Sequence, residues 1–113
     1  MKKKEIRLRC WIEIDGEKFF GPGPAELLEL IGEVGSIANA AKKMGMSYKK
    51  AWDMVEELNT RGQKPFVISR KGGEKGGGAE LTETGKKVIL KYRNLTAKLK
   101  AIVENDKDIL KLV

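Results

Sequence analysis

The pattern of apolar and polar positions changes from strand-like to helix-like early in the chain. Apolar side chains alternate with polar ones over residues 6–14, which predicts a strand with one buried face. The pair Asp15-Gly16 signals a tight turn, so residues 17–20 are expected to return as a short second strand. Apolar residues then recur every three or four positions over residues 24–34, and this spacing predicts a helix.

Two further helices are predicted around a glycine turn. Ser36 can cap a short helix whose apolar residues keep helical spacing as far as Met44. Gly45 can end that helix, because glycine adopts the left-handed conformation at little cost. Ser47 can cap the next helix, which is expected to run to Arg61. Two capped helices joined by a tight turn form a helix-turn-helix, a motif typical of DNA-binding proteins.

The second helix of this motif has two different faces. Its apolar side consists of Tyr48, Ala51, Trp52, Val55 and Leu58. We expect Trp52 to lie in the core and to anchor the helix, and stacking on a base is the alternative. Lys49 and Lys50 lie on the opposite side in the first turn, where the helix dipole disfavours cations. A phosphate or a guanine edge near that turn would offset the cost, although two exposed lysines in a lysine-rich chain are also compatible with a simple solvated surface.

A β-hairpin is predicted after this helix, with strands at residues 66–68 and 79–81 and a glycine-rich loop between them. A hairpin in this place is a wing. Its cationic contacts would be Arg70, Lys71 and Lys75. A mobile linker is the alternative interpretation of the loop. A Walker-type phosphate loop is disfavoured, because Gly78 stands where that motif requires a lysine.

The last predicted helix covers residues 83–103 and is capped by Thr82. Its apolar residues are spaced by four and three positions, as in a heptad seam. The seam consists of Val88, Tyr92, Leu95, Leu99 and Ile102. Such a seam favours pairing of two copies in a homodimer, and docking onto the chain's own domain is the alternative. Apolar residues from Ile109 onward predict a short ordered tail.

Composition and charge narrow the function. The 113 residues carry a net charge of +7, and residues 36–78 hold nine basic and four acidic side chains. The excess of positive charge therefore begins at the helix-turn-helix, which favours a polyanionic partner such as double-stranded DNA. With one cysteine and no histidine, the sequence predicts no disulfide, no metal site, no cofactor and no enzyme. It shows neither a signal peptide nor a membrane span, so we expect a cytoplasmic protein.

Several short motifs match one known family of domains. They are Gly35-Ser36-Ile37, Ala40-Ala41, Gly45-Met46-Ser47-Tyr48-Lys49, Ala51-Trp52, Asn59, Gly72-Gly73, Gly76-Gly77-Gly78-Ala79, Leu81-Thr82 and Gly85. In these motifs the chain resembles the DNA-binding domain of ModE-type regulators, which belongs to the LysR-like winged helix-turn-helix group. The resemblance covers roughly residues 17–95. It implies a homodimer that binds operator DNA, with residues 47–61 in the major groove and the wing against the backbone or minor groove.

The resemblance does not extend to molybdate sensing. Molybdate-responsive members carry their ligand sites in additional C-terminal domains, for which this sequence has no room. We therefore expect no molybdate site in these residues. A separate effector-sensing protein and a different signal are both compatible with the sequence.

These observations predict an α+β, mainly helical fold in a single domain over residues 1–113. An N-terminal hairpin is expected at 1–20, a winged helix-turn-helix at 24–82, and a dimerisation helix with its tail at 83–113. The predicted function is that of a homodimeric, sequence-specific DNA-binding transcriptional regulator. An architectural DNA-binding protein without strong sequence preference and a winged-helix protein-interaction module are the alternatives.

The DNA contacts expected from this interpretation come from three places. Base or near-base contacts are assigned to Lys49, Lys50 and Asp53, since lysine can donate to guanine and aspartate can accept from cytosine. Phosphate contacts are assigned to Lys42, Ser47 and Tyr48. The wing supplies the cationic contacts of Arg70, Lys71 and Lys75.

Overall fold

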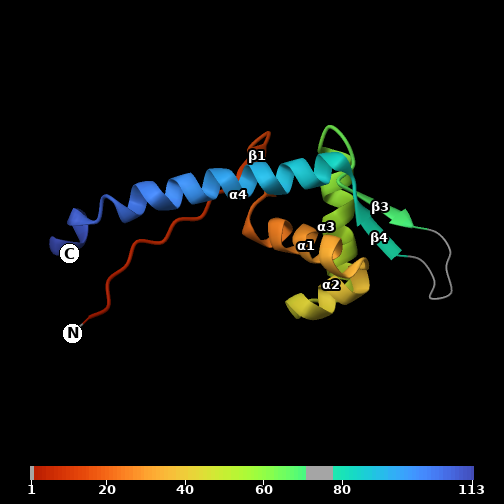
Figure 1. Ribbon diagram of the computed structural model, residues 1–113, viewed down its shortest axis with the longest axis horizontal. Coiled ribbons are helices and arrows are strands. Elements are labelled where there is room, and N and C mark those ends of the chain that lie inside the picture. Colours follow the sequence, from red (N-terminus) through yellow and green to blue (C-terminus); the bar gives the residue numbers. More distant parts are fainter. Residues whose placement is uncertain (1, 71–77) are drawn as a thin grey trace.

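Three short helices pack on one another beside one end of a long fourth helix, which the first of them contacts and which extends well beyond them (Figure 1). The computed structural model describes residues 2–70 and 78–113. Its elements in chain order are β1 (Ile12–Ile14), β2 (Glu17–Phe20), α1 (Pro22–Val34), α2 (Ile37–Met44), α3 (Tyr48–Arg61), β3 (Val67–Arg70), β4 (Gly78–Leu81), α4 (Glu83–Glu104) and the 3-10 turn η1 (Asp108–Lys111). The predicted α+β winged helix-turn-helix with an N-terminal hairpin and a long last helix is confirmed.

The core gathers around Phe20, a fully buried side chain at the end of β2. Its ring meets Phe66 and Tyr92 edge-on, with centroids 6.3 and 5.1 Å away. These contacts join the hairpin, the segment before the wing and α4 in one aromatic cluster. The largest other side chains that are fully buried are Leu27, Leu28, Ile31 and Leu58.

The helix boundaries follow the predicted caps. Side-chain oxygens of Ser36, Ser47 and Thr82 each accept a hydrogen bond from the backbone N–H three residues later, at 3.1, 3.1 and 3.0 Å. Gly35 and Gly45 follow α1 and α2 with a φ of 70°, the left-handed conformation that glycine adopts most easily. Each polar cap therefore fixes a helix start at the position expected from sequence.

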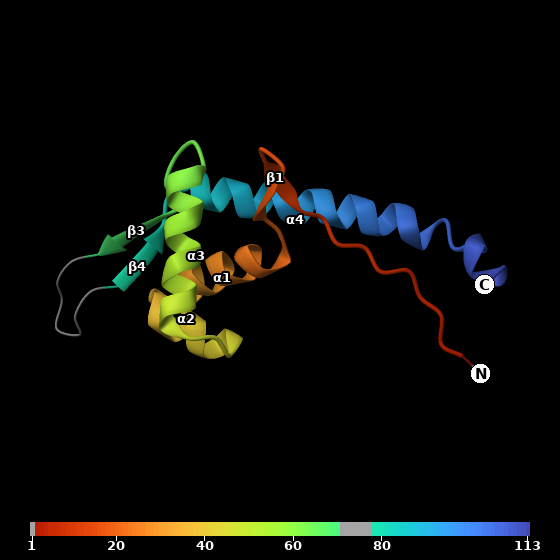
Figure 2. The same ribbon diagram turned by 180° about the vertical axis from the view of Figure 1, so that it is seen from behind.

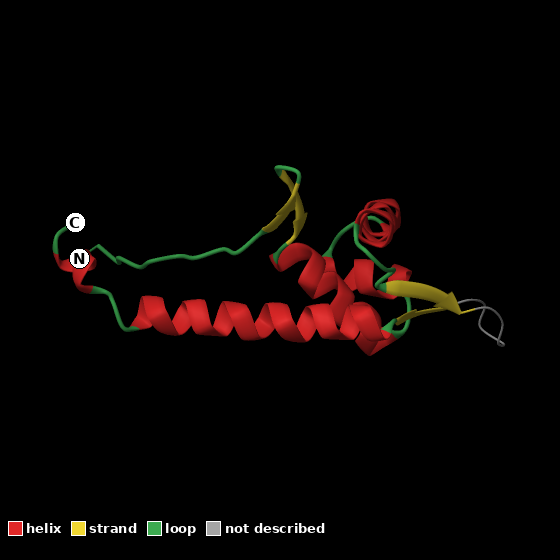
Figure 3. Cartoon of the chain, turned by 90° about the horizontal axis from the view of Figure 1, so that it is seen from above, coloured by secondary structure: helices red, strands yellow, loops and turns green. Residues whose placement is uncertain are grey.

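The first hairpin turns at Asp15 and Gly16, whose φ values of 52° and 80° are typical of a type I′ turn. The strand expected over residues 6–14 is wrong in extent, because β1 covers only its last three residues. β2 has four residues and runs directly into α1, so it offers no backbone with which a longer strand could pair. Residues 2–11 instead run beside α4 without forming a strand (Figure 3).

Tyr92 of α4 is a second correction. It was expected in the exposed seam, but only 3% of it is accessible, and its hydroxyl donates a 2.8 Å hydrogen bond to the carbonyl of Cys10. Burial raises the pKa of this phenol. One turn of the predicted seam is thus already covered by the chain's own N-terminal segment. Nearby, Arg93 donates to Glu29 at 2.9 Å and links α4 to α1.

The first turn of α4 lies against the segment that leads into the wing. The Thr82 hydroxyl donates to the carbonyl of Pro65 at 2.7 Å, and the Thr82 N–H donates to the carbonyl of Phe66 at 2.9 Å. A Cβ at Gly85 would lie 2.3 Å from that Phe66 oxygen. Only glycine permits this close approach, so Gly85 sets how near α4 comes to the wing.

Within the described residues, no helix is both long and apolar enough to cross a membrane.

We expect Gly85→Ala to destabilise the protein by about 1–3 kcal/mol, because the added methyl group must displace backbone rather than a flexible side chain. Gly23→Ala is the matched control. Gly23 also lies in the first turn of a helix, but its Cβ would meet nothing within 4 Å. Urea unfolding followed by circular dichroism measures both variants, and equal midpoints for the two would contradict the proposed close packing.

Candidate nucleic-acid interface

Helix α3 lies beside the wing (Figure 2). The exposed side chains of its N-terminal half spread over three adjoining strips of the helix surface. At about 100° per residue, Lys49 and Asp53 point away from the core. Tyr48 and Trp52 line a cleft shared with the start of α2 and the wing. Lys50 lies farther round the helix, where it lines a groove together with Asp53 and with Trp11, the residue before β1. Asp53 therefore lies between the two lysines that are predicted to contact bases.

Lys49 and Asp53 are brought together on the outward strip. The ammonium of Lys49 lies 3.3 Å from the Asp53 carboxylate, and both side chains are mostly exposed. An exposed ion pair contributes little to stability, so either group can exchange its partner for DNA at small cost. Both side chains are thus available on the surface of the first two turns.

Trp52 is a correction to the sequence prediction. It was expected to anchor α3 in the core, yet 44% of its surface is exposed. Ala51, Val55 and Leu58 form the buried stripe instead. The alanine faces the core directly, whereas the next residue is turned by about 100° toward the wing. A helix that buries a narrow stripe leaves this indole on the surface.

The remaining predicted contacts lie around this helix. Lys42 is on the exposed face of α2. The Ser47 oxygen accepts the cap hydrogen bond, which leaves the hydroxyl proton for a phosphate. Arg70 ends β3 and lies 3.2 Å from Glu80 across the wing. Lys71 and Lys75 fall outside the described residues.

Asn59 links α3 to the wing, a role that the sequence did not reveal. Its amide oxygen accepts hydrogen bonds from the backbone N–H groups of Phe66 and Val67, at 2.8 and 3.2 Å. Its amide nitrogen donates to the carbonyl of Val67 at 2.9 Å. One side chain thereby holds the backbone at the start of β3. A single asparagine near the end of a predicted helix carries no signal that distinguishes this use from simple exposure.

The wing is also fixed at its second strand. β3 and β4 pair antiparallel from Val67 opposite Leu81 to Arg70 opposite Gly78. The N–H of Ala79 donates to the carbonyl of Gly35 at 2.9 Å, at the turn between α1 and α2. The wing is therefore bound to α3 at one strand and to the α1–α2 turn at the other.

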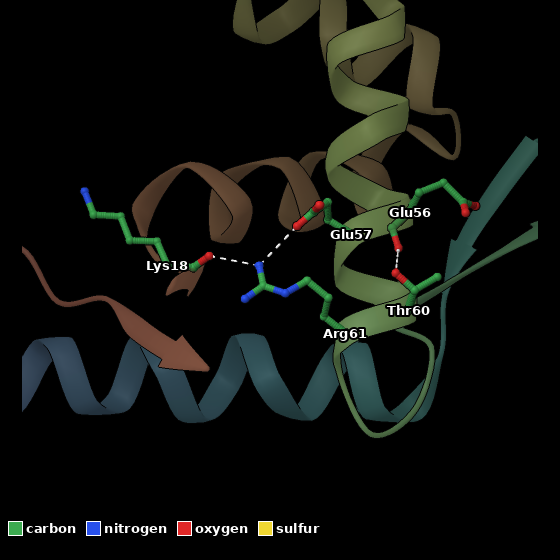
Figure 4. A network of polar contacts seen from close by, with 5 residues as sticks. All are labelled: Lys18, Glu56, Glu57, Thr60 and Arg61. Carbon is green, nitrogen blue, oxygen red and sulfur yellow. Dashed lines mark hydrogen bonds and ion pairs between the residues drawn. The ribbon is translucent and has the colours of Figure 1, made fainter. Parts of the chain in front are cut away.

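The far end of α3 is bound to the first hairpin (Figure 4). The Arg61 guanidinium donates to the backbone carbonyl of Lys18 and to the Glu57 carboxylate, both at 3.1 Å. It also lies over the Phe19 ring, 5.5 Å from its centroid. These contacts fix the C-terminal turn of α3, so its exposed N-terminal half projects from a rigid base.

The chain is similar to known transcriptional regulators, although no protein-family model matches it. It is 44% identical over 69 residues to the molybdenum transport protein ModE of Azotobacter vinelandii, covering 61% of this chain and 26% of that protein. It is 38% identical over 81 residues to the DNA-binding transcriptional dual regulator ModE of Escherichia coli (strain K12), covering 72% and 31%. The chain thus spans between a quarter and a third of these relatives.

Solved structures show the same fold. A LysR family transcriptional regulator aligns with a TM-score of 0.55 and 20% identity, covering 74% of this chain and 27% of its own. Vibrio fischeri DarR, solved in complex with DNA, aligns with a TM-score of 0.56 and 19% identity, covering 79% and 29%. The fold is that of a LysR-type winged-helix DNA-binding domain. Over its N-terminal part the chain has homologues among regulators named ModE, which confirms the resemblance found in the sequence.

We expect Asn59→Ala to lower the free energy of unfolding by about 1–3 kcal/mol, because backbone groups at the start of β3 lose their partners. The matched control is Asn94→Ala, which removes an exposed asparagine from α4. Chemical denaturation gives the stability, and amide hydrogen exchange at Val67 reports the local effect. Unchanged exchange at Val67 in the Asn59 variant would show that the side chain does not hold the wing.

Proposed function

We propose that the protein is a sequence-specific, DNA-binding transcriptional regulator that uses α3 as its recognition helix. The observation that carries this proposal is the surface made by the N-terminal half of α3 and the wing. Lys49 and Arg70 are exposed there, and each is held only by an exposed ion pair. The named regulators that resemble the chain support the same function.

The charges along α3 set how far it would enter the major groove. Lys49 and Lys50 stand in its first turn, whereas Glu56 and Glu57 are exposed two turns later. Phosphates attract the first pair and repel the second. The first two turns therefore approach the bases, while the last turns stay near the groove edge, where the Arg61 contacts hold them.

We also propose that two copies pair through the C-terminal half of α4. Leu95 and Ile102 of the predicted seam are 43% and 63% exposed, and Leu99 is half-buried. At 22 residues α4 is about 33 Å long, so this half extends past the core. Pairing would bury these side chains and create a two-fold axis. Two recognition helices could then reach major grooves about 34–36 Å apart.

Such a regulator would act in the cytoplasm, on DNA. In this proposal, a separate effector-sensing protein is one partner that could pass a signal to the regulator.

For DNA recognition, we expect Lys49→Ala to weaken binding to the preferred duplex by about 1–3 kcal/mol and to random duplex by less. Lys111→Ala is a matched control. Its ammonium is as exposed as that of Lys49 and also pairs with an aspartate one turn away, but it lies at the other end of the molecule (Figure 1). Fluorescence anisotropy at several salt concentrations measures both variants. Equal losses on both duplexes would exclude base reading by Lys49.

For the dimer, we expect Leu95→Glu combined with Ile102→Glu to give a folded monomer, because pairing would bury unpaired carboxylates. Affinity for the preferred duplex should fall at least tenfold. Leu90→Glu is the control, since Leu90 is 60% exposed on another face of α4. Sedimentation equilibrium measures the oligomeric state. A double variant that remains as dimeric as the Leu90 variant would place the interface elsewhere.

A further inference from the structure

The cleft between α3 and the wing has a mixed lining that the lysine contacts do not use. Its volume is about 350 Å³. Ser36, Ser69 and Arg70 supply polar groups at its edge, and Trp52 with Tyr48 supplies aromatic surface from α3. Backbone N–H groups at the start of α2 also favour an anion on this side. The cleft therefore has a charged edge suited to a phosphate and an aromatic wall suited to an apolar group.

The exposure of Trp52 is the observation that requires a partner. A tryptophan is large and mostly apolar, and exposed aromatic side chains are characteristic of contact surfaces. Trp52 lies one turn after Tyr48 and one turn before Glu56, within the part of α3 that precedes the acidic turns. It is thus on the part of the helix that our proposed function places in the major groove.

We propose that Trp52 recognises thymine by packing its indole against the C5-methyl group in the major groove. This inference rests on the proposed function, because it requires α3 to enter that groove. The thymine methyl group is the apolar feature of the base-pair edges exposed there. Bases in a duplex stay stacked and present only their edges, so the contact is with a methyl group rather than by ring stacking. Arg70 at the cleft edge would hold a nearby phosphate and orient the strand.

The test removes one methyl group at a time. The preferred duplex is first selected from a random library with the wild-type protein, and each thymine is then replaced singly by deoxyuridine. We expect one thymine in each half-site at which the replacement weakens wild-type binding about fourfold, the value of one buried carbon. Trp52→Ala should bind the parent duplex more weakly and show no response to that replacement.

Trp52→Phe separates the apolar contact from the indole N–H. Phenylalanine keeps an apolar ring but cannot donate a hydrogen bond, so this variant should retain the response to deoxyuridine. Suppose instead that Trp52→Ala and Trp52→Phe each lose as much affinity for random duplex as for the preferred duplex. The indole then binds a phosphate, and the proposal is overturned. Lys49→Ala is the control, since its contact is elsewhere and it should keep the full response.

The fluorescence of the two tryptophans gives an independent measurement. In Trp11→Phe the emission comes from Trp52 alone, and we expect the preferred duplex to change it. In Trp52→Phe it comes from Trp11 alone and should stay constant. A response from Trp11 only, or no thymine at which wild type and Trp52→Ala differ, overturns the inference. If the library yields no preferred duplex, the proposed function fails first, and this inference fails with it.

Discussion

The position of the wing depends on the hydrogen bonds of one side chain, Asn59. Its amide group satisfies two backbone donors and one acceptor at the entrance to β3. Asn59 supplies hydrogen-bond partners for these backbone groups, and an unpaired polar group away from water is costly. Because Asn59 belongs to α3, the same hydrogen bonds that satisfy the backbone of the wing also fix the distance between the wing and α3. Trp52 lies in the cleft between α3 and the wing.

The other end of the wing is positioned by glycine rather than by hydrogen bonding alone. A Cβ at Gly78 would lie 2.7 Å from the carbonyl oxygen of Gly35, and the corresponding contact at Gly85 is tighter still. The wing, the α1–α2 turn and the start of α4 thus meet backbone to backbone. Such contacts do not adjust as flexible side chains do. A wing fixed in this way next to α3 fits the proposed function, in which base and phosphate contacts must form together.

Exposed charges on this surface are held loosely, in contrast to the backbone beneath them. Lys49 and Arg70 both take part in ion pairs that water screens well. The protein therefore combines a fixed scaffold with side chains that can change partners.

α4 also has a packed part and an exposed part. Its first half closes the core through Tyr92, and its second half leaves Leu95 and Ile102 exposed.

Local chemistry determined much of this structure. Ser36, Ser47 and Thr82 cap helices through bonds to residues three positions away, so their effect is readable without any knowledge of the fold. The Asp15-Gly16 turn is equally local. The motifs of the helix-turn-helix and wing were specific enough to indicate the family resemblance, and the LysR-type fold followed from it.

Tertiary structure decided what depends on partners distant in the chain. The alternating pattern of residues 6–14 does not reveal that β2 is too short to pair with all of it. Helical spacing puts Trp52 and Tyr92 on apolar faces, but whether a face is covered depends on what packs there. Cys10 and the N-terminal segment cover Tyr92, whereas the described chain leaves 44% of Trp52 exposed. The sequence alone determines which residues share a face, and the packing of distant segments determines which faces remain exposed.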